Sequence, residues 1–269
     1  MKHFGRIVTV FVYLLLYAPL VVMVFFSFNA SSSTSVFEGF SLKWYQELFN
    51  QRDIINALKN TLLLAFSSAA AATLIGTLAA VGIYNIRSRW AQSALMGVTN
   101  IPMMNPDIVT GVSLMLLFVF VGRLLGAAES LSFWTLLIAH ITFNIPYVLL
   151  NVLPKLRQTD HYLVEAAMDL GCTPVRAFFK VVLPAIMPGV ISGALMAFTL
   201  SLDDFVISYY TNGADFQTLP LLLYSMTKRK VKPDMYALSS LMFVAILLLL
   251  LLSNIMQIRS EKKNKGVIK

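Results

Sequence analysis

Long apolar runs constrain this chain more than any other feature of its sequence. Six runs alternate with short polar segments, at residues 7–28, 61–83, 94–121, 133–153, 186–208 and 236–256. A helix needs roughly 20 apolar residues to cross the hydrocarbon core of a bilayer, and each run is long enough. Only 13% of the 269 residues are charged, well below the share found in soluble domains. The sequence therefore predicts an all-α membrane protein with six transmembrane helices, forming a single transmembrane domain over 1–269.

The first run could be a membrane span or a cleaved signal sequence. Lys2 and Arg6 precede it, and residues 29–31 form a conceivable cleavage region. The apolar segment of a signal peptide has roughly 7–15 residues, which is shorter than the run at 7–28. We therefore expect an uncleaved first span at 7–28.

The third run, 94–121, is interrupted by two prolines. Asn105, Pro106 and Asp107 follow one another, as an N-cap, a proline at the first helical position and an acid in the first turn would. This pattern predicts that the helix breaks and restarts there. Asp107 then either compensates the helix dipole or lines a cavity, where broken helices are tolerated.

Polar and small residues mark the faces of the later runs. His140, Asn144 and Asn151 form one stripe at spacings of four and seven, and we expect His140 to be a hydrogen-bonded structural residue. Small residues at spacings of three or four predict tight helix contacts. They are Ala65, Ala69, Ala72, Gly76 and Ala80 in the second run, and Gly189, Gly193 and Ala197 in the fifth.

The acidic residues of the apolar runs are the best clue to what the protein moves. Asp107, Asp203 and Asp204 lie inside or at the edges of the runs, with no Lys or Arg among them. A carboxylate near mid-span costs roughly 2.5–3.5 kcal/mol, and an anionic lining favours a cation. Helical spacing points Asp204 toward the packed interior. The alternative is that the pair caps a helix break or lies at the outer interface beside Tyr209 and Tyr210.

Residues 159–184 form a strongly polar passage between two apolar runs. Helix start and stop signals predict two short helices within it. The first begins at an N-cap and ends at a glycine in the left-handed conformation, and the second begins at an N-cap followed by proline and ends at another proline. In order, these are Thr159 or Asp160, Gly171, Thr173-Pro174 and Pro184.

The residue pattern of this passage resembles the EAA signature of ABC-importer permeases. That signature reads E-A-A, three residues, G, nine residues, I, one residue, L-P, and Val181 stands here where isoleucine is usual. The resemblance implies that 159–184 is a cytoplasmic coupling helix, which docks in a cleft of a separate ATPase subunit. The ATPase-coupling residues that it implies are Glu165, Ala166, Ala167, Gly171, Leu183 and Pro184.

A wider resemblance covers nearly the whole chain. Residues 103–109, 140–143, 201–204, 219–221 and 224–226 look like the C-type permease of spermidine/putrescine ABC importers. This implies the type I ABC importer (MetI-like) permease fold, with a core permease domain at 57–257. The pore half would move polyamines, and the implied substrate-pathway residues are Asp203, Asp204, Asp107, Asn144, Tyr209 and Tyr210. The alternatives are the same importer for an amino acid, phosphonate, thiamine or chelated metal, and a transporter or receptor that works without ATP.

The resemblance also implies partners. They are a second permease subunit in a heterodimer, a homodimeric ABC ATPase that holds ATP and Mg²⁺, and an extracytoplasmic polyamine-binding protein. The chain itself has no G-x-x-x-x-G-K-[ST] loop for ATP, and its three scattered histidines predict no metal site. We therefore expect no cofactor in this chain and no enzymatic activity. Its net charge of +8 reflects loop topology and anionic lipid headgroups in a membrane protein, and not nucleic acid.

The distribution of basic residues predicts the orientation. Lys and Arg are more numerous on the side that holds both termini, the turn at 86–93 and the coupling segment, which places that side in the cytoplasm. We expect a multi-pass protein of the bacterial inner membrane with both termini cytoplasmic. The basic cluster at 228–232 opposes this rule, because it falls in the expected outer loop.

Overall fold

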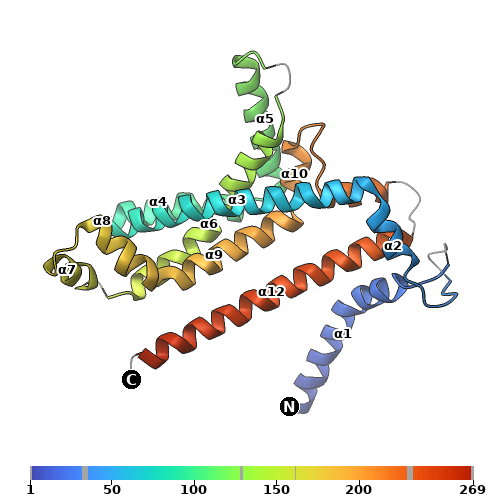
Figure 1. Ribbon diagram of the computed structural model, residues 1–269, viewed down its shortest axis with the longest axis horizontal. Helices are drawn as coiled ribbons and strands as arrows, with labels where there is room; N and C mark the ends of the chain where they lie inside the picture. The colour runs from blue at the N-terminus through green and yellow to red at the C-terminus, as the bar shows by residue number, and fades with distance from the viewer. Residues whose placement is uncertain (1, 32–35, 128–129, 161, 229–232, 268–269) are drawn as a thin grey trace. The chain divides into compact units, whose positions relative to one another are not determined.

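The computed structural model describes residues 2–31, 36–127, 130–160, 162–228 and 233–267. Regular structure in these residues is helical, apart from one isolated bridge between Asn29 and Phe40. The elements in chain order are α1 (Lys2–Phe26), α2 (Lys43–Asn50), α3 (Arg52–Asn85), α4 (Arg89–Met104), α5 (Asp107–Leu124), α6 (Phe133–Gln158), α7 (Tyr162–Asp169), α8 (Pro174–Ala177), the π-helical turn η1 (Phe178–Val182), α9 (Leu183–Asp203), α10 (Val206–Thr211), α11 (Leu219–Thr227) and α12 (Pro233–Val267) (Figure 1).

Among the described residues, six helical segments are long and apolar enough to cross a membrane, as the sequence predicts. They are Phe4–Phe26, Arg52–Asn85, Asp107–Leu124, Phe133–Gln158, Pro174–Asp203 and Pro233–Leu252. Their exposed apolar surface agrees with burial in lipid, because large hydrophobic side chains of α1 such as Phe4, Leu14 and Val21 are more than half exposed. The chain is therefore an all-α, multi-pass membrane protein.

The chain divides into two compact units. The first comprises residues 1–58 and 219–249, and the second residues 59–218 and 250–269. The first unit has its own small core, in which Trp44 and Leu48 of α2 pack with Leu219, Ala237 and other buried apolar residues. The polar segment between the first two apolar runs therefore contains a helix, α2. The predicted outer loop also contains a helix, α11, which the sequence reasoning did not anticipate.

The second unit is built on the packing of α6 against α9 (Figure 1). The predicted glycines allow it, because a Cβ atom on Gly189 would lie 2.8 Å from the backbone oxygen of Asn151, and one on Gly193 would lie 3.1 Å from the Cα of Val148. On α3, a Cβ on Gly76 would lie 2.8 Å from the Cβ of Val148. Small residues at these crossings therefore bring three backbones together, as expected of helices packing in lipid.

The third apolar run breaks as predicted, into α4 and α5. Asn105 is the C-cap of α4, and Pro106 precedes the first residue of α5, Asp107. The prediction that Asn105 is the N-cap of the restarted helix is therefore wrong. Pro106 occupies the N-cap position of α5, and no side chain caps that helix. Of the two helices, α5 has the length and apolarity of a span.

Pro184 does not close a helix, contrary to the prediction. Helical backbone continues from Pro174 through η1 into α9, with Val182 at φ −68° and ψ −52°. Pro184 stands in the first turn of α9, directly after the π-helical turn. Pro184 has no N–H, so one ladder hydrogen bond is missing at this point of the continuous helix, and the π-helical turn before it marks the place where the ladder changes register.

Candidate functional site

The coupling segment folds as two helices joined by a glycine turn, as its caps predict. The Asp160 carboxylate accepts from the Tyr162 amide at 3.0 Å, and the Thr173 hydroxyl accepts from the Arg176 amide at 3.4 Å. Gly171 has φ +84°, where glycine is preferred. Its amide donates to the Met168 carbonyl at 2.9 Å. Cys172 donates to the Ala167 carbonyl at 3.0 Å, which completes a Schellman turn.

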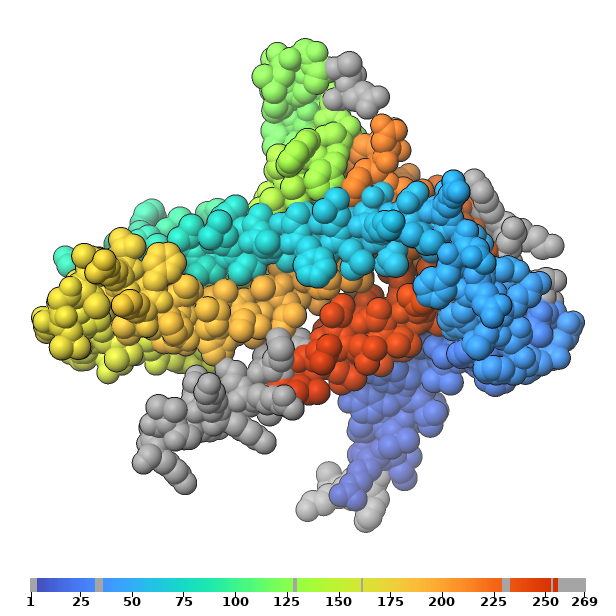
Figure 2. Space-filling model, in the orientation of Figure 1, coloured from blue at the N-terminus to red at the C-terminus, as the bar shows by residue number. Residues whose placement is uncertain are grey.

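This segment presents an apolar surface at one end of the second unit (Figure 2, yellow). Its exposed large side chains are Tyr162, Leu163, Met168, Leu170, Val175 and Phe179. Of the residues implied to couple to an ATPase, Glu165, Ala166, Gly171 and Pro184 are exposed. Ala167 is buried and Leu183 half-buried, so these two support the segment from within. So many exposed large apolar side chains within one short segment are typical of a protein interface.

A cavity of about 560 Å³ lies behind the coupling segment. Its walls come from the ends of α3 and α6, from α7, and from α8 with η1. Glu165 and Asp160 contribute carboxylates to an otherwise largely apolar lining. Glu165 is thus both exposed and adjacent to a hollow that separates α7 from the spans.

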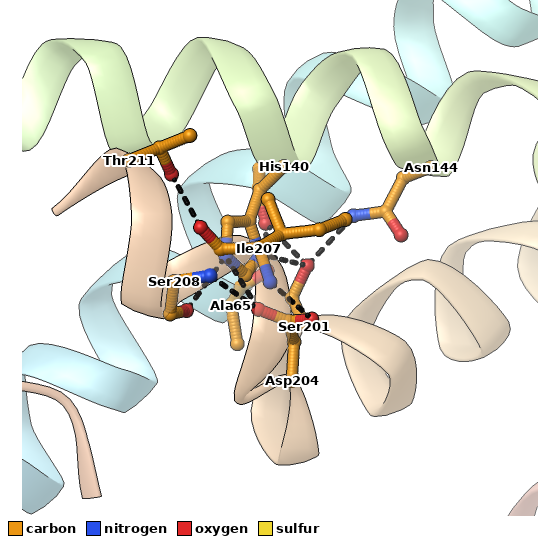
Figure 3. Close-up of polar contacts among 9 residues, drawn as sticks. Ala65, His140, Asn144, Ser201, Asp204, Ile207, Ser208 and Thr211 are labelled. Carbon is orange, nitrogen blue, oxygen red and sulfur yellow. Dashed lines mark hydrogen bonds and ion pairs between the residues drawn. The ribbon is translucent and has the colours of Figure 1, made fainter. Parts of the chain in front are cut away.

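The other end of α9 stops at the acidic pair. Asp204 takes an extended conformation, φ −63° and ψ 125°, and α10 begins two residues later. Its carboxylate accepts from the backbone amides of Ser208 at 2.8 Å and Ile207 at 3.3 Å (Figure 3). The expectation that Asp204 points inward is confirmed. The expected continuous span to residue 208 is wrong, because the carboxylate satisfies the first amides of a new helix instead.

A buried polar network surrounds this break (Figure 3). The His140 ring is fully buried, with Nδ1 3.1 Å from the Ser201 hydroxyl and Nε2 3.1 Å from the Ser208 hydroxyl. Nε2 also lies 3.5 Å from the Asp204 carboxylate. Asn144 donates to the Ser201 hydroxyl at 2.7 Å. His140 is therefore a hydrogen-bonded structural residue, as predicted.

The remaining predicted pathway residues lie outside this network. Asp203 and Asp107 are exposed, and so is Tyr209. Tyr210 is half-buried and packs on α5, since a Cβ on Gly111 would lie 3.1 Å from its ring. Asp204 and Asn144 therefore lie inside the helix packing, Asp203, Asp107 and Tyr209 lie on its surface, and Tyr210 is half-buried between α10 and α5.

Comparison with known proteins identifies the chain's relatives. A family model described as "Binding-protein-dependent transport system inner membrane component" matches residues 72–265. The chain belongs to this family. It is 41% identical over 253 residues to the spermidine/putrescine transport system permease protein PotC of Haemophilus influenzae, covering 94% of this chain and 95% of that one. It is 38% identical over 258 residues to PotC of Escherichia coli, covering 96% and 95%.

Two further comparisons extend this result. The putrescine transport system permease protein PotI of Escherichia coli is 38% identical over 248 residues, covering 92% of this chain and 88% of PotI. Among solved structures, a bacterial ABC transporter that imports alginate has a chain of TM-score 0.73 at 15% identity, covering 96% of this chain and 95% of that chain. The MetNI methionine ABC transporter has one of TM-score 0.60 at 18% identity, covering 76% and 94%.

These likenesses confirm the predicted permease fold of type I ABC importers. As a permease component, the chain is a transport subunit and not an enzyme, in agreement with the lack of a phosphate-binding loop in its sequence. The core boundaries at 57–257 stay a prediction.

Sequence reasoning missed the serines of the permease. Ser68 of α3 lies 2.9 Å from Ser201 of α9, hydroxyl to hydroxyl, and both are buried. The signal was present in part, because Ser201 precedes the acidic pair and stands four residues after Ala197 on the packed face. What the spacing could not show is which helices meet there.

Replacing Asp204 should destabilise the permease in a graded way. We expect Asp204→Ala to cost about 1–3 kcal/mol, because it removes the cap of α10 and leaves buried donors without an acceptor. Asp204→Asn should cost less, since the amide oxygen still accepts from the Ser208 backbone. Thermal denaturation in detergent measures both, with Asp215→Ala, an exposed acid, as the control. Equal stability of the alanine variant and the wild type would contradict this role.

Proposed function

We propose that this permease forms half of the translocation pore of an ATP-driven importer for the polyamines spermidine and putrescine. The observation that carries the proposal is its identity of 38–41% to polyamine permeases over more than nine-tenths of the chain. The permease contributes exposed carboxylates at two helix breaks, Asp107 at the start of α5 and Asp203 at the end of α9. Anionic groups of this kind favour the passage of a cation.

The chemistry of a polyamine suits this surface. Its ammonium groups are separated by short aliphatic chains, so a pathway needs spaced negative charges and apolar or aromatic walls. Asp203 supplies an exposed charge, and the exposed Tyr209 ring lies on the next helix. Aromatic faces attract ammonium groups by about 0.5–2 kcal/mol. We assign Asp203, Asp107 and Tyr209 to the pathway, with Asp204 and Asn144 supporting it from inside and Tyr210 holding α10 on α5.

The proposed assembly contains a second permease subunit, a homodimeric ABC ATPase that binds ATP and Mg²⁺, and an extracytoplasmic binding protein. A solved relative in fold is an alginate ABC transporter in complex with a ligand-bound periplasmic protein, which supports partners of this kind. We propose that the exposed apolar surface of the coupling segment docks on the ATPase, with Glu165, Ala166 and Gly171 at the contact. Both termini then lie in the cytoplasm of a bacterial cell.

One continuous helix connects the coupling segment to the acidic turn, so it could carry movement of the ATPase into the membrane. The helical stretch Pro174–Asp203 has 30 residues, which corresponds to about 45 Å. It begins in the coupling segment and ends at the acidic turn. We propose that closure of the ATPase dimer moves this helix, and that the movement changes access to Asp203.

Uptake of labelled spermidine tests the substrate. In cells deleted for this gene, we expect the wild-type permease to restore uptake and Asp203→Asn to reduce it roughly tenfold, since one exposed charge partner is worth on the order of 1 kcal/mol or more. Asp53→Asn, which removes an exposed acid in the first turn of α3, is the matched control. Excess unlabelled putrescine shows whether both polyamines use the pore. If the wild type restores no polyamine uptake, the importer family stands and another solute must be sought.

A further inference from the structure

The turn between α9 and α10 gives two consecutive carboxylates opposite environments. Asp203, the last residue of α9, is exposed, whereas the Asp204 side chain is only 9% exposed. The helix ends between them, because Asp204 is extended and points into the packing against α6 (Figure 3). Because the two residues are adjacent at the end of α9, a movement of Asp204 away from α6 would also move Asp203.

One side chain touches every part of this turn. His140 of α6 contacts Ser201 in the last turn of α9, Asp204 in the turn itself, and Ser208 in α10. A carboxylate only accepts hydrogen bonds, so the ring proton that faces Asp204 belongs on Nε2, which leaves Nδ1 to accept from the Ser201 hydroxyl. The buried imidazole of α6 thus contacts α9, the turn and α10 at the same time.

We propose that His140 is a positioning residue, which holds Asp204 inward and thereby turns the Asp203 carboxylate toward the translocation pathway. That Asp203 faces the pathway, and which cation passes it, rest on the proposed function, whereas the exposure of Asp203 beside a buried Asp204 does not. Without the imidazole, Asp204 loses its partner on α6 while it still caps α10 through Ile207 and Ser208. The Asn144–Ser201 and Thr135–Thr211 hydrogen bonds still join α6 to α9 and α10. The loss is therefore confined to the turn itself, where Asp204 is no longer held against α6 while α10 keeps its cap.

Cysteine labelling measures the position of residue 203 without any transported solute. Cys172 is the single cysteine of the sequence, so Cys172→Ser combined with Asp203→Cys gives one thiol in this permease subunit, whose labelling is read on the subunit after separation from its partners. We expect a charged, membrane-impermeant thiol reagent to label it rapidly when His140 is present and roughly tenfold more slowly in His140→Asn, within the range that coupling networks reach. His140→Gln should retain rapid labelling, because its longer amide reaches the position of Nε2 beside Asp204. The asparagine amide reaches only that of Nδ1.

The controls separate positioning from simple packing. Thr142→Ala alters an exposed residue of α6 whose hydroxyl donates to the Ile138 carbonyl at 2.8 Å, and it should leave the labelling rate unchanged. Ser208→Ala removes one contact of the ring and should slow labelling less than His140→Asn. Equal rates in the wild type, His140→Gln and His140→Asn would overturn the proposal, and so would faster labelling in asparagine than in glutamine.

Transport by reconstituted, assembled transporter completes the test. If His140 acts through Asp203, the double variant His140→Asn/Asp203→Asn transports no more slowly than Asp203→Asn alone, because the two changes are not independent. Losses that multiply would overturn the positioning role. If the wild type transports no polyamine but the labelling difference is still observed, the substrate proposal fails. The position assigned to Asp203 is then still supported.

Discussion

Glu165→Lys is expected to abolish co-purification of the permease with its ATPase. Glu165 is exposed on α7, within the coupling segment that we propose as the docking face. If the ATPase docks here as proposed, reversing the charge places a lysine where the partner would have to complement a carboxylate. Loss of such an interfacial partner costs about 2–5 kcal/mol, which weakens binding by roughly a factor of 30 or more. The measurement is the ratio of ATPase to tagged permease after gentle solubilisation.

The control for this variant is a charge reversal elsewhere in the same unit. Asp215→Lys changes an exposed acid that lies after α10, outside the coupling segment, and it should retain the ATPase. The isolated Glu165→Lys permease should also keep its thermal stability, because Glu165 is exposed and lies outside the hydrophobic core of its unit. Normal ATPase recovery with Glu165→Lys would remove Glu165 from the docking face.

Gly189→Leu should prevent the permease from folding. A Cβ at this position meets the backbone oxygen of Asn151 at 2.8 Å, and a backbone atom in the middle of α6 cannot move aside as the tip of a side chain can. Overpacking typically costs 1–3 kcal/mol, and we expect more than about 3 kcal/mol because α6 and α9 form the central pair of their unit. The yield of monodisperse protein in detergent and its melting temperature report the loss.

A second glycine provides the matched comparison. Gly82 lies on α3 with nothing within 4 Å of the Cβ position, so Gly82→Leu carries the same change of residue type without the steric conflict. It should express as well as the wild type. If Gly189→Leu also folds normally, α6 and α9 do not pack as closely as described.

The spans and the glycine turn could be predicted because their causes are local. Apolar runs longer than the bilayer core specify helices whatever they pack against, and Gly171 specifies a left-handed helix end through its own backbone. The behaviour of Pro184 was not predictable from the residue alone. Proline often ends a helix, but here the helix continues through Pro184, and a π-helical turn directly precedes α9.

The site was predictable as a set of acids, but the arrangement of the acids was not. Spacing placed Asp204 toward the packed interior, as observed. It could not show that His140, more than 60 residues earlier, would meet Ser201 and Ser208 across α6, α9 and α10. Contacts between distant segments depend on which helix faces meet, and a stripe of polar residues shows only that a face is buried in protein or water. The basic cluster, of which 229–232 lie outside the described residues, stays unexplained.

The close contacts of Gly189 and Gly193 give the long helix Pro174–Asp203 the mechanics of an unequal lever. About 22 Å of helix separate Pro174 from Gly189, and about 15 Å separate Gly193 from Asp203, at 1.5 Å per residue. A tilt about the glycine contacts displaces the two ends in opposite directions. The acidic turn then moves about two-thirds as far as the coupling segment, with a correspondingly larger force. Under the proposed function, a larger movement of the ATPase would thus produce a smaller displacement of the Asp203 carboxylate.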